Sequence, residues 1–226
     1  AAMDGVLSAE LAEGGFEAAT AVLEPGGGLD RAIIQDGSAQ IVPATFDHWE
    51  ILNNSFKPYA ACHLTHPTID AARALQCLPE DIKRARARIG ELAQQITGET
   101  DGKPASPLAA KFDIKYCAAL ALTGREVSAA DFEEPWQLDA ELGELAGRIE
   151  TVADSKYGFA SANLEVETRD GRVEIIDIPV AKGHPGNPID WTDMRAKYDG
   201  LVEGRVTEES DQLFGHLQAF GRDGSN

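Results

Sequence analysis

The sequence has few basic residues and no long apolar run, and these absences exclude several classes of protein. Lysine and arginine number 20 against 38 aspartates and glutamates, so the 226-residue chain has a formal net charge of -18. Nucleic acids and anionic membrane surfaces are bound through basic surfaces, so neither is expected as a partner. No apolar run approaches the roughly 20 residues of a membrane span. Because no signal peptide opens the chain either, we expect a cytoplasmic protein.

Cysteine is also scarce, with three residues in the whole chain. Cys62, Cys77 and Cys117 are odd in number and irregularly spaced, which indicates reduced thiols rather than a disulfide framework. A nominal zinc set could be drawn from Cys62, His63, His66 and Cys77, but no second closely spaced pair lies at a finger-like distance. We therefore expect no metal and no other cofactor.

The densest polar chemistry lies in residues 56–72, which read FKPYAACHLTHPTIDAA. The candidate polar side chains of this turn-forming stretch are Lys57, Cys62, His63 and His66. Pro67 then stands at the first position of a helix, where its missing N–H is not needed. A helix N-terminus carries free N–H groups and about half a positive charge, so a carboxylate is a natural ligand. The stretch predicts the rim of a site for a small anionic substrate, although solvated loop and cap residues would explain it too.

Hydrophobic periodicity predicts a sheet in the middle of the chain. Residues 81–89 alternate small or apolar side chains with basic ones, which is typical of a half-buried strand. The solvated face of this strand would consist of Arg84, Arg86 and Arg88. Further strands are predicted at residues 148–153, 163–169 and 172–180. The last two would be joined by a hairpin turn at Asp170-Gly171.

Helical patterns surround these strands. Helices are predicted at residues 3–11, 67–78, 106–122, 189–202 and 213–220. Tyr116 lies on the apolar stripe of one of them, where an aromatic side chain is more often part of the core than of a site. Asp70, in the helix that Pro67 begins, is expected to favour the helix dipole, and His184 is expected to be part of a loop.

Several of these motifs, in this order, resemble those of a known family. They are Lys57-Pro58-Tyr59, Thr65-His66, Ile69-Asp70-Ala71-Ala72, the run 110–116 and the run 183–188. Glycine-containing stretches near residues 5, 14–16 and 24–28 agree as well. The chain resembles the MmgE/PrpD family over nearly all of its length. Members of that family act as 2-methylcitrate dehydratases, cis-aconitate decarboxylases and iminodisuccinate epimerases.

The resemblance implies an α+β lid domain, built on a small, mostly antiparallel sheet, that is inserted in an all-helical domain. Residues 1–45 would end the helical domain, residues 46–182 would form the lid, and residues 183–226 would return to the helical domain. A family member is about twice this length, so we expect the chain to be a C-terminal half. Some active-site groups would then lie upstream. Relatives are commonly dimers, so a homodimer is expected.

The implied activity is a metal-independent lyase, either a dehydratase or a decarboxylase, acting on a small di- or tricarboxylate such as the 2-methylcitrate of propionate catabolism. Lys57 would bind a substrate carboxylate, and His63 would be the general acid or base. In some relatives the reactive histidine aligns with Cys62, which leaves His66 as an alternative. The resemblance also raises Tyr116 to a catalytic candidate. An epimerase using the same residues, or an inactive binding or dimerisation module, remains an alternative.

Overall fold

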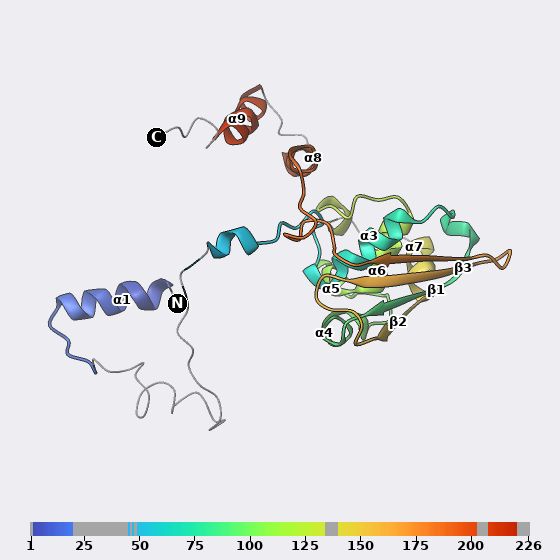
Figure 1. The fold of residues 1–226 in the computed structure, drawn as a ribbon, viewed down its shortest axis with the longest axis horizontal. Coiled ribbons are helices and arrows are strands. Elements are labelled where there is room, and N and C mark those ends of the chain that lie inside the picture. Colours follow the sequence, from blue (N-terminus) through green and yellow to red (C-terminus); the bar gives the residue numbers. More distant parts are fainter. Residues whose placement is uncertain are drawn as a thin grey trace. The chain divides into compact units, whose positions relative to one another are not determined.

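The computed structural model describes residues 2–19, 45, 47, 49–133, 140–202 and 208–220. The chain divides into two compact units, Ala1–Trp49 and Glu50–Asn226. The first unit contains the helix α1, Ala2–Glu13, which confirms the helix predicted at the start of the chain (Figure 1). This helix ends at a Gly14-Gly15 turn, where Gly15 adopts the left-handed backbone conformation that favours glycine.

The second unit is built on a four-stranded sheet in the order β2-β1-β3-β4. The strands are β1 (Ile82–Ile89), β2 (Ile149–Ala153), β3 (Ala162–Thr168) and β4 (Val173–Ile178). Strand β1 runs parallel to β2 and antiparallel to β3, and β3 runs antiparallel to β4. The prediction of an α+β fold with a mostly antiparallel sheet is confirmed. The single parallel pair needs a long crossover, and the chain between β1 and β2 supplies it with helices.

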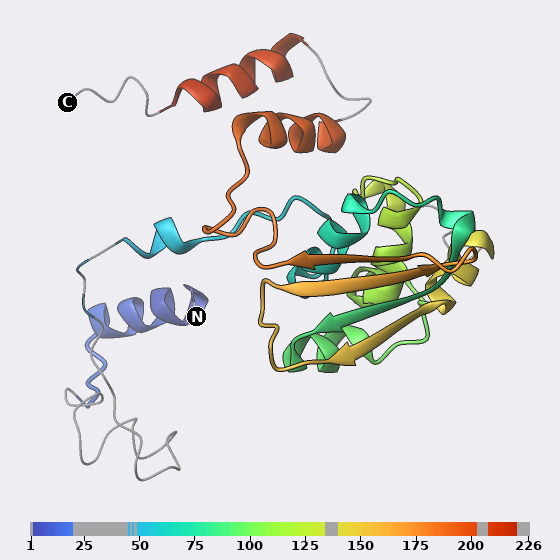
Figure 2. The same ribbon diagram turned by 45° about the vertical axis from the view of Figure 1, so that its right-hand side comes forward.

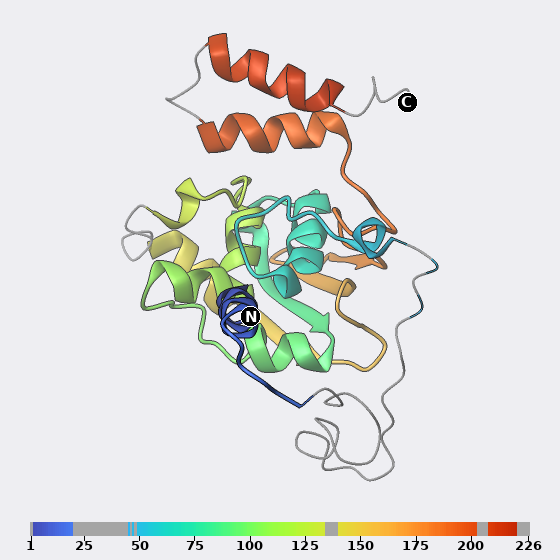
Figure 3. The ribbon, with the colours of Figure 1, turned by 90° about the vertical axis from the view of Figure 1, so that its left-hand side faces the viewer.

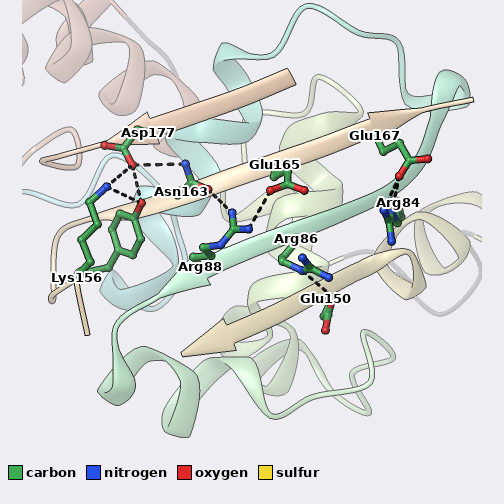
Figure 4. Close-up of polar contacts among 10 residues, drawn as sticks. Arg84, Arg86, Arg88, Glu150, Lys156, Asn163, Glu165, Glu167 and Asp177 are labelled. Carbon is green, nitrogen blue, oxygen red and sulfur yellow. Dashed lines mark hydrogen bonds and ion pairs between the residues drawn. The ribbon is translucent and has the colours of Figure 1, made fainter. Parts of the chain in front are cut away.

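The alternation along β1 separates its two faces as predicted. The inward-facing residues are buried and consist of Ile82, Ala85, Ala87 and Ile89. On the other face each arginine pairs with an acidic side chain of a neighbouring strand (Figure 4). The ion pairs are Arg84 with Glu167, Arg86 with Glu150 and Arg88 with Glu165. These basic side chains are therefore neutralised across the strands, which suits cross-strand pairing on a solvated face.

Helices cover the inward face of the sheet (Figure 2). Helix α3, His66–Ala74, packs against β3 and β4, while α6, Ile114–Leu122, packs against α3 and reaches β2. Helix α7, Ala140–Gly147, packs against α6 and β2. The single helix predicted over residues 106–122 is instead two helices, α5 (Pro107–Phe112) and α6, because Asp113 breaks the pattern. Asp113 has extended backbone and caps the second helix.

Short helical turns fill the connections. They are η1 (Glu50–Asn53), η2 (His63–Thr65), η3 (Pro79–Asp81), α4 (Glu91–Ala93), the π-helical turn η4 (Gln94–Gly98) and η5 (Ala130–Phe132). The turn η2 runs directly into α3, so two of the candidate histidines begin successive helical elements.

The predicted C-terminal helices are present as α8, Trp191–Val202, and α9, Glu208–Ala219, the second beginning earlier than the pattern suggested. The two lie side by side as an antiparallel pair (Figure 3). Phe214 packs between the rings of Trp191 and Tyr198. Arg195 joins the helices through an ion pair with Asp211. Among the helices described, none is both long enough and apolar enough to cross a membrane.

Candidate active site

The side chain of Lys57 and the ring of His66 meet at one backbone carbonyl. The Lys57 ammonium donates a hydrogen bond to the carbonyl oxygen of Ala61 at 3.2 Å, and Nε2 of His66 lies 3.4 Å from the same oxygen. The stretch from 57 to 66 must therefore fold back on itself. The structure thus brings the candidate lysine to the histidine cluster.

The two candidate histidines are in ring contact. The ring centroids of His63 and His66 are 4.9 Å apart, and the other side of His63 contacts Phe159 at 4.9 Å in an edge-to-face arrangement. His66 is fully buried, whereas His63 is only half-buried. Of the two rings, His63 is therefore the one that a small molecule can reach.

The environment keeps both imidazoles neutral. Burial lowers the pKa of His66 to about 3, with a further contribution from the neighbouring His63. The pKa of His63 is also lowered, first by burial and then by the neighbouring side chains of Lys57 and His184. Nε2 of His63 is buried and has no hydrogen-bond partner among the described residues. A neutral ring whose nitrogen lacks a protein partner is suited to accept a proton.

The turn between the two histidines is fixed by backbone contacts. The N–H and the hydroxyl of Thr65 both donate to the carbonyl of Cys62, at 3.0 and 2.8 Å. The N–H of Cys62 in turn donates to the carbonyl of Lys111 at 2.8 Å, which ties the turn to α5. The Cys62 side chain is half-buried, so this candidate lies at the edge of the cluster.

The first turn of α3 does not face open solvent. Pro67 stands in that first turn as predicted, but Thr65, His66 and Thr68 are all fully buried. The start of α3 is therefore enclosed by the fold rather than presented to solvent.

Tyr116 lies on α6 and is almost fully buried. Its backbone N–H and that of Lys115 donate to the Asp113 carboxylate at 3.0 Å each, and its ring lies 6.4 Å from that of Phe132. This is the environment of the core aromatic that the apolar stripe predicted. The catalytic role that the family resemblance implied for Tyr116 stays a prediction.

A loop that is distant in sequence completes the site. The N–H of Phe56 donates to the carbonyl of Gly183 at 2.8 Å, which places His184 close to Lys57 along the chain path. The N–H of Lys182 donates to the Asp70 carboxylate at 2.7 Å. Sequence reasoning treated Asp70 as a dipole residue and His184 as loop structure. No local pattern could have found these contacts, because their partners are more than 100 residues apart.

A hollow shares Phe159 with the ring contact of His63, although none of the candidate residues lines it. It has a volume of about 290 Å³ and is lined by Leu64, Gly90, Glu91, Leu92, Ala93, Ser155, Tyr157, Gly158 and Phe159. Gly90 is required here, because a Cβ atom would come within 2.7 Å of the Tyr157 carbonyl oxygen. Within the described parts of the chain, no three His, Cys, Asp or Glu residues come together as a metal-binding group.

Comparison with known proteins shows to which family this chain belongs. The model of the MmgE/PrpD C-terminal domain matches residues 59–219. The chain belongs to the MmgE/PrpD family. The matched range contains four of the candidate residues, and Lys57 lies two positions before it.

Two fungal members of the MmgE/PrpD family are similar to this chain over most of its length. Cis-aconitate decarboxylase of Aspergillus terreus is 24% identical over 237 residues, and the same enzyme from Aspergillus terreus strain NIH 2624 / FGSC A1156 is 27% identical over 237 residues. Each alignment covers 93% of this chain but 48% of the relative. The chain therefore spans about half the length of the curated relatives it matches.

Proposed function

We propose that the protein is a lyase, a dehydratase or decarboxylase, that acts on a small di- or tricarboxylate such as 2-methylcitrate or cis-aconitate. The match to the MmgE/PrpD C-terminal domain and the similarity to two cis-aconitate decarboxylases support this class of reaction. A homodimer and a cytoplasmic location remain expectations.

The difficult step in such a reaction is formation of a carbanion. In a dehydration, a base removes a proton next to a carboxylate, the charge spreads onto that carboxylate, and the β-hydroxyl group then leaves as water after it takes up a proton. In a decarboxylation, carbon dioxide leaves, the electron pair of the broken bond stays on the remaining carbon skeleton, and an acid returns a proton to it. Fixed positive groups and hydrogen-bond donors where the charge grows give the largest stabilisation of the transition state. A positioned base with a pKa near or below neutrality removes the proton.

The side chains divide naturally between these two tasks. The Lys57 ammonium would bind and neutralise the substrate carboxylate, and His63 would take and return the proton. His66 is fully buried, so it would support the ring of His63 rather than touch substrate. Cys62 would lie at the rim, and Tyr116 would act from α6.

One observation supports the proposal above the others: the ring of His63 has a buried Nε2 without a partner in the described chain, and the Lys57 ammonium is near enough to help lower the pKa of that ring. A buried nitrogen without a protein partner is costly unless a ligand or water supplies the bond. A substrate C–H or carboxylate group at this point would be within reach of both side chains.

The proposal is tested by turnover of cis-aconitate and of 2-methylcitrate with the full-length protein in deuterated water. We expect a new carbon–carbon double bond from 2-methylcitrate or release of carbon dioxide from cis-aconitate, and we expect Lys57→Ala and His63→Ala each to lower kcat/KM by about 100-fold or more, the usual size of a general acid-base effect. Lys103→Ala and His216→Ala are matched controls, because both residues are exposed outside the site, and they should leave turnover unchanged.

Two results would contradict the proposal. Turnover within about threefold of the parent in both site variants would remove Lys57 and His63 from the mechanism. Deuterium exchange without dehydration or release of carbon dioxide would instead favour the epimerase of an iminodisuccinate-like acid, which needs the same proton transfer but no elimination.

A further inference from the structure

Three stretches of the chain deliver the polar groups of the site. Residues 57–63 carry Lys57 and His63, helix α3 carries His66, and the loop 182–187 carries His184. The first two are continuous through the turn η2, whereas the loop 182–187 lies more than 100 residues further along the sequence. Their common anchor is one carboxylate, that of Asp70.

Asp70 binds the other two segments with its two oxygens. Oδ1 accepts a hydrogen bond from the Tyr59 hydroxyl at 2.6 Å, and Oδ2 accepts one from the backbone N–H of Lys182 at 2.7 Å. Asp70 itself lies on α3. Hydrogen bonds to an ionised acceptor are the stronger kind, so the carboxylate links all three segments.

The contact of Tyr59 extends this link to the imidazoles. Its ring packs edge-to-face against that of His66 at 5.1 Å, and His66 in turn packs against His63. The Arg73 guanidinium lies over the other side of Tyr59, 5.9 Å from the ring centroid. A movement of Tyr59 would therefore displace the ring of His66 and, through it, the ring of His63.

The hydrogen bond from Lys182 to Asp70 holds the loop that carries His184. Two residues further along, Nδ1 of His184 accepts a hydrogen bond from the N–H of Gly186 at 3.0 Å. A neutral His184 must then carry its proton on Nε2, which leaves an N–H donor for a ligand. The loop is also held by the bond from Phe56 to Gly183.

We propose that Asp70 is a positioning residue that holds the Tyr59 segment, α3 and the 182–187 loop in one geometry, so that His184 joins Lys57 and His63 as a third group facing the substrate carboxylates. The proposal rests on the function proposed above for the same site. A helix-dipole role alone would not explain why both oxygens of a half-buried carboxylate are used by two other segments.

The test uses the 226-residue chain labelled on histidine and on backbone nitrogen, observed by NMR without substrate. In Asp70→Asn the amide can still accept from Tyr59, but its NH₂ group cannot accept from the Lys182 N–H. We expect the Lys182 amide to exchange with solvent about tenfold faster. The imidazole signals of His63 and His184 should shift, while the signal of His216 should not.

Asp170→Asn is the matched control, because Asp170 also accepts hydrogen bonds from a side-chain hydroxyl and a backbone N–H, those of Thr168 and Arg172. It lies in the turn between β3 and β4, so it should leave His63 and His184 unchanged. If Asp70→Asn does not fold, Tyr59→Phe can be used instead. It removes only the hydrogen bond from the Tyr59 hydroxyl to Asp70, and it should still shift the NMR signals of His66 and His63.

A purely structural role for Asp70 predicts a different result. The variant would then unfold more easily, but the native signals of His63 and His184 would match the parent, and that outcome would overturn the proposal. Because the NMR test needs no turnover, it separates failure of this inference from failure of the proposed lyase function. In the active protein, kcat/KM should fall about tenfold or more in Asp70→Asn and not in Asp170→Asn.

Discussion

At the scale of single residues, burial decides which histidine can act. His63 and His66 are three positions apart and were equivalent candidates in the sequence. In the fold, His66 is fully enclosed with a pKa of about 3, whereas His63 keeps part of its ring accessible. The first is therefore a neutral packing residue at neutral pH, and the second is the one that the proposed mechanism needs to be reachable.

The buried imidazole should make stability depend on pH. Because the folded-state pKa of His66 is lowered from 6.5 to about 3, the unfolded chain binds a proton first as the pH falls. The contribution of His66 to the unfolding free energy is fully present above pH 6.5 and is lost progressively toward pH 3. The loss between pH 7 and pH 5 is about 2 kcal/mol.

Urea unfolding at pH 7 and pH 5 measures this loss. In His66→Gln, the fall in unfolding free energy from pH 7 to pH 5 should be smaller than in the parent by about 2 kcal/mol. In His216→Gln, at an exposed position of α9, the fall should equal that of the parent. An unchanged pH dependence in His66→Gln would show that His66 titrates normally in the folded protein.

At the scale of elements, the break between α5 and α6 depends on one capping carboxylate. Periodicity ran through residues 106–122 without interruption, because the apolar spacing continues across Asp113. Asp113 is nearly fully buried and accepts from two N–H groups of the first turn of α6, so the backbone leaves the helix there and starts again. Burial raises the pKa of Asp113, and these two hydrogen bonds offset part of that cost.

Removing this cap should destabilise the layer behind the sheet. Asp113→Ala should lower the unfolding free energy by about 1–2 kcal/mol, while Asp113→Asn, which keeps an acceptor oxygen, should lose less. Ser106→Ala removes the cap of α5, where the hydroxyl accepts from Ala109 at an exposed site, and should cost less than Asp113→Ala. Urea unfolding of the three variants checks the order, and an Asp113→Ala as stable as the parent would show that the cap is not needed.

At the scale of the whole molecule, the net charge of -18 opposes an anionic substrate. The acidic side chains on the outer face of the sheet are largely paired, as the ladder of Arg84, Arg86 and Arg88 shows (Figure 4). Close to the candidate site, by contrast, Lys57 is joined by Lys197, whose ammonium donates to the Lys57 carbonyl at 2.6 Å. Positive charge is thus concentrated locally, and salt screens the long-range field of the whole protein more than it screens such close charges.

The contact between residues 56 and 183 can be tested with two glycines. Gly183 and Gly171 share a φ of +87°, but a Cβ atom at Gly183 would lie 1.9 Å from the Phe56 carbonyl oxygen, whereas one at Gly171 meets nothing within 4 Å. Gly171→Ala should therefore cost about 1–2 kcal/mol from backbone strain alone, and Gly183→Ala should cost roughly 3 kcal/mol or more.

Unfolding free energies of the two alanine variants give the comparison directly. The Gly183→Ala variant should also shift the NMR signals of Lys57 and His184, because the two segments must separate to admit the methyl group. Equal costs for the two substitutions would mean that the approach of residue 183 to residue 56 is not maintained in solution.

The sequence by itself determined most of the strands and helices, though not the break at Asp113 or the start of α9, and it determined the location of the densest polar chemistry. Alternation along residues 81–89, the Asp170-Gly171 turn and Pro67 at a helix start are local signals, because side-chain period, turn conformation and the missing N–H act within a few residues. The concentration of Lys57, Cys62, His63 and His66 could be found for the same reason. The MmgE/PrpD resemblance followed from the order of such motifs along the chain.

Only the tertiary structure decided how these residues differ from one another. Which histidine is enclosed, that Asp70 joins Tyr59 to Lys182, and that residue 183 returns to residue 56 all depend on groups that meet across the fold. Burial and hydrogen bonding between distant segments leave no periodic trace in a sequence, because they arise from packing of whole elements. The residue types therefore indicated the chemistry of the candidate site, but they did not indicate which of these residues are enclosed and which are accessible.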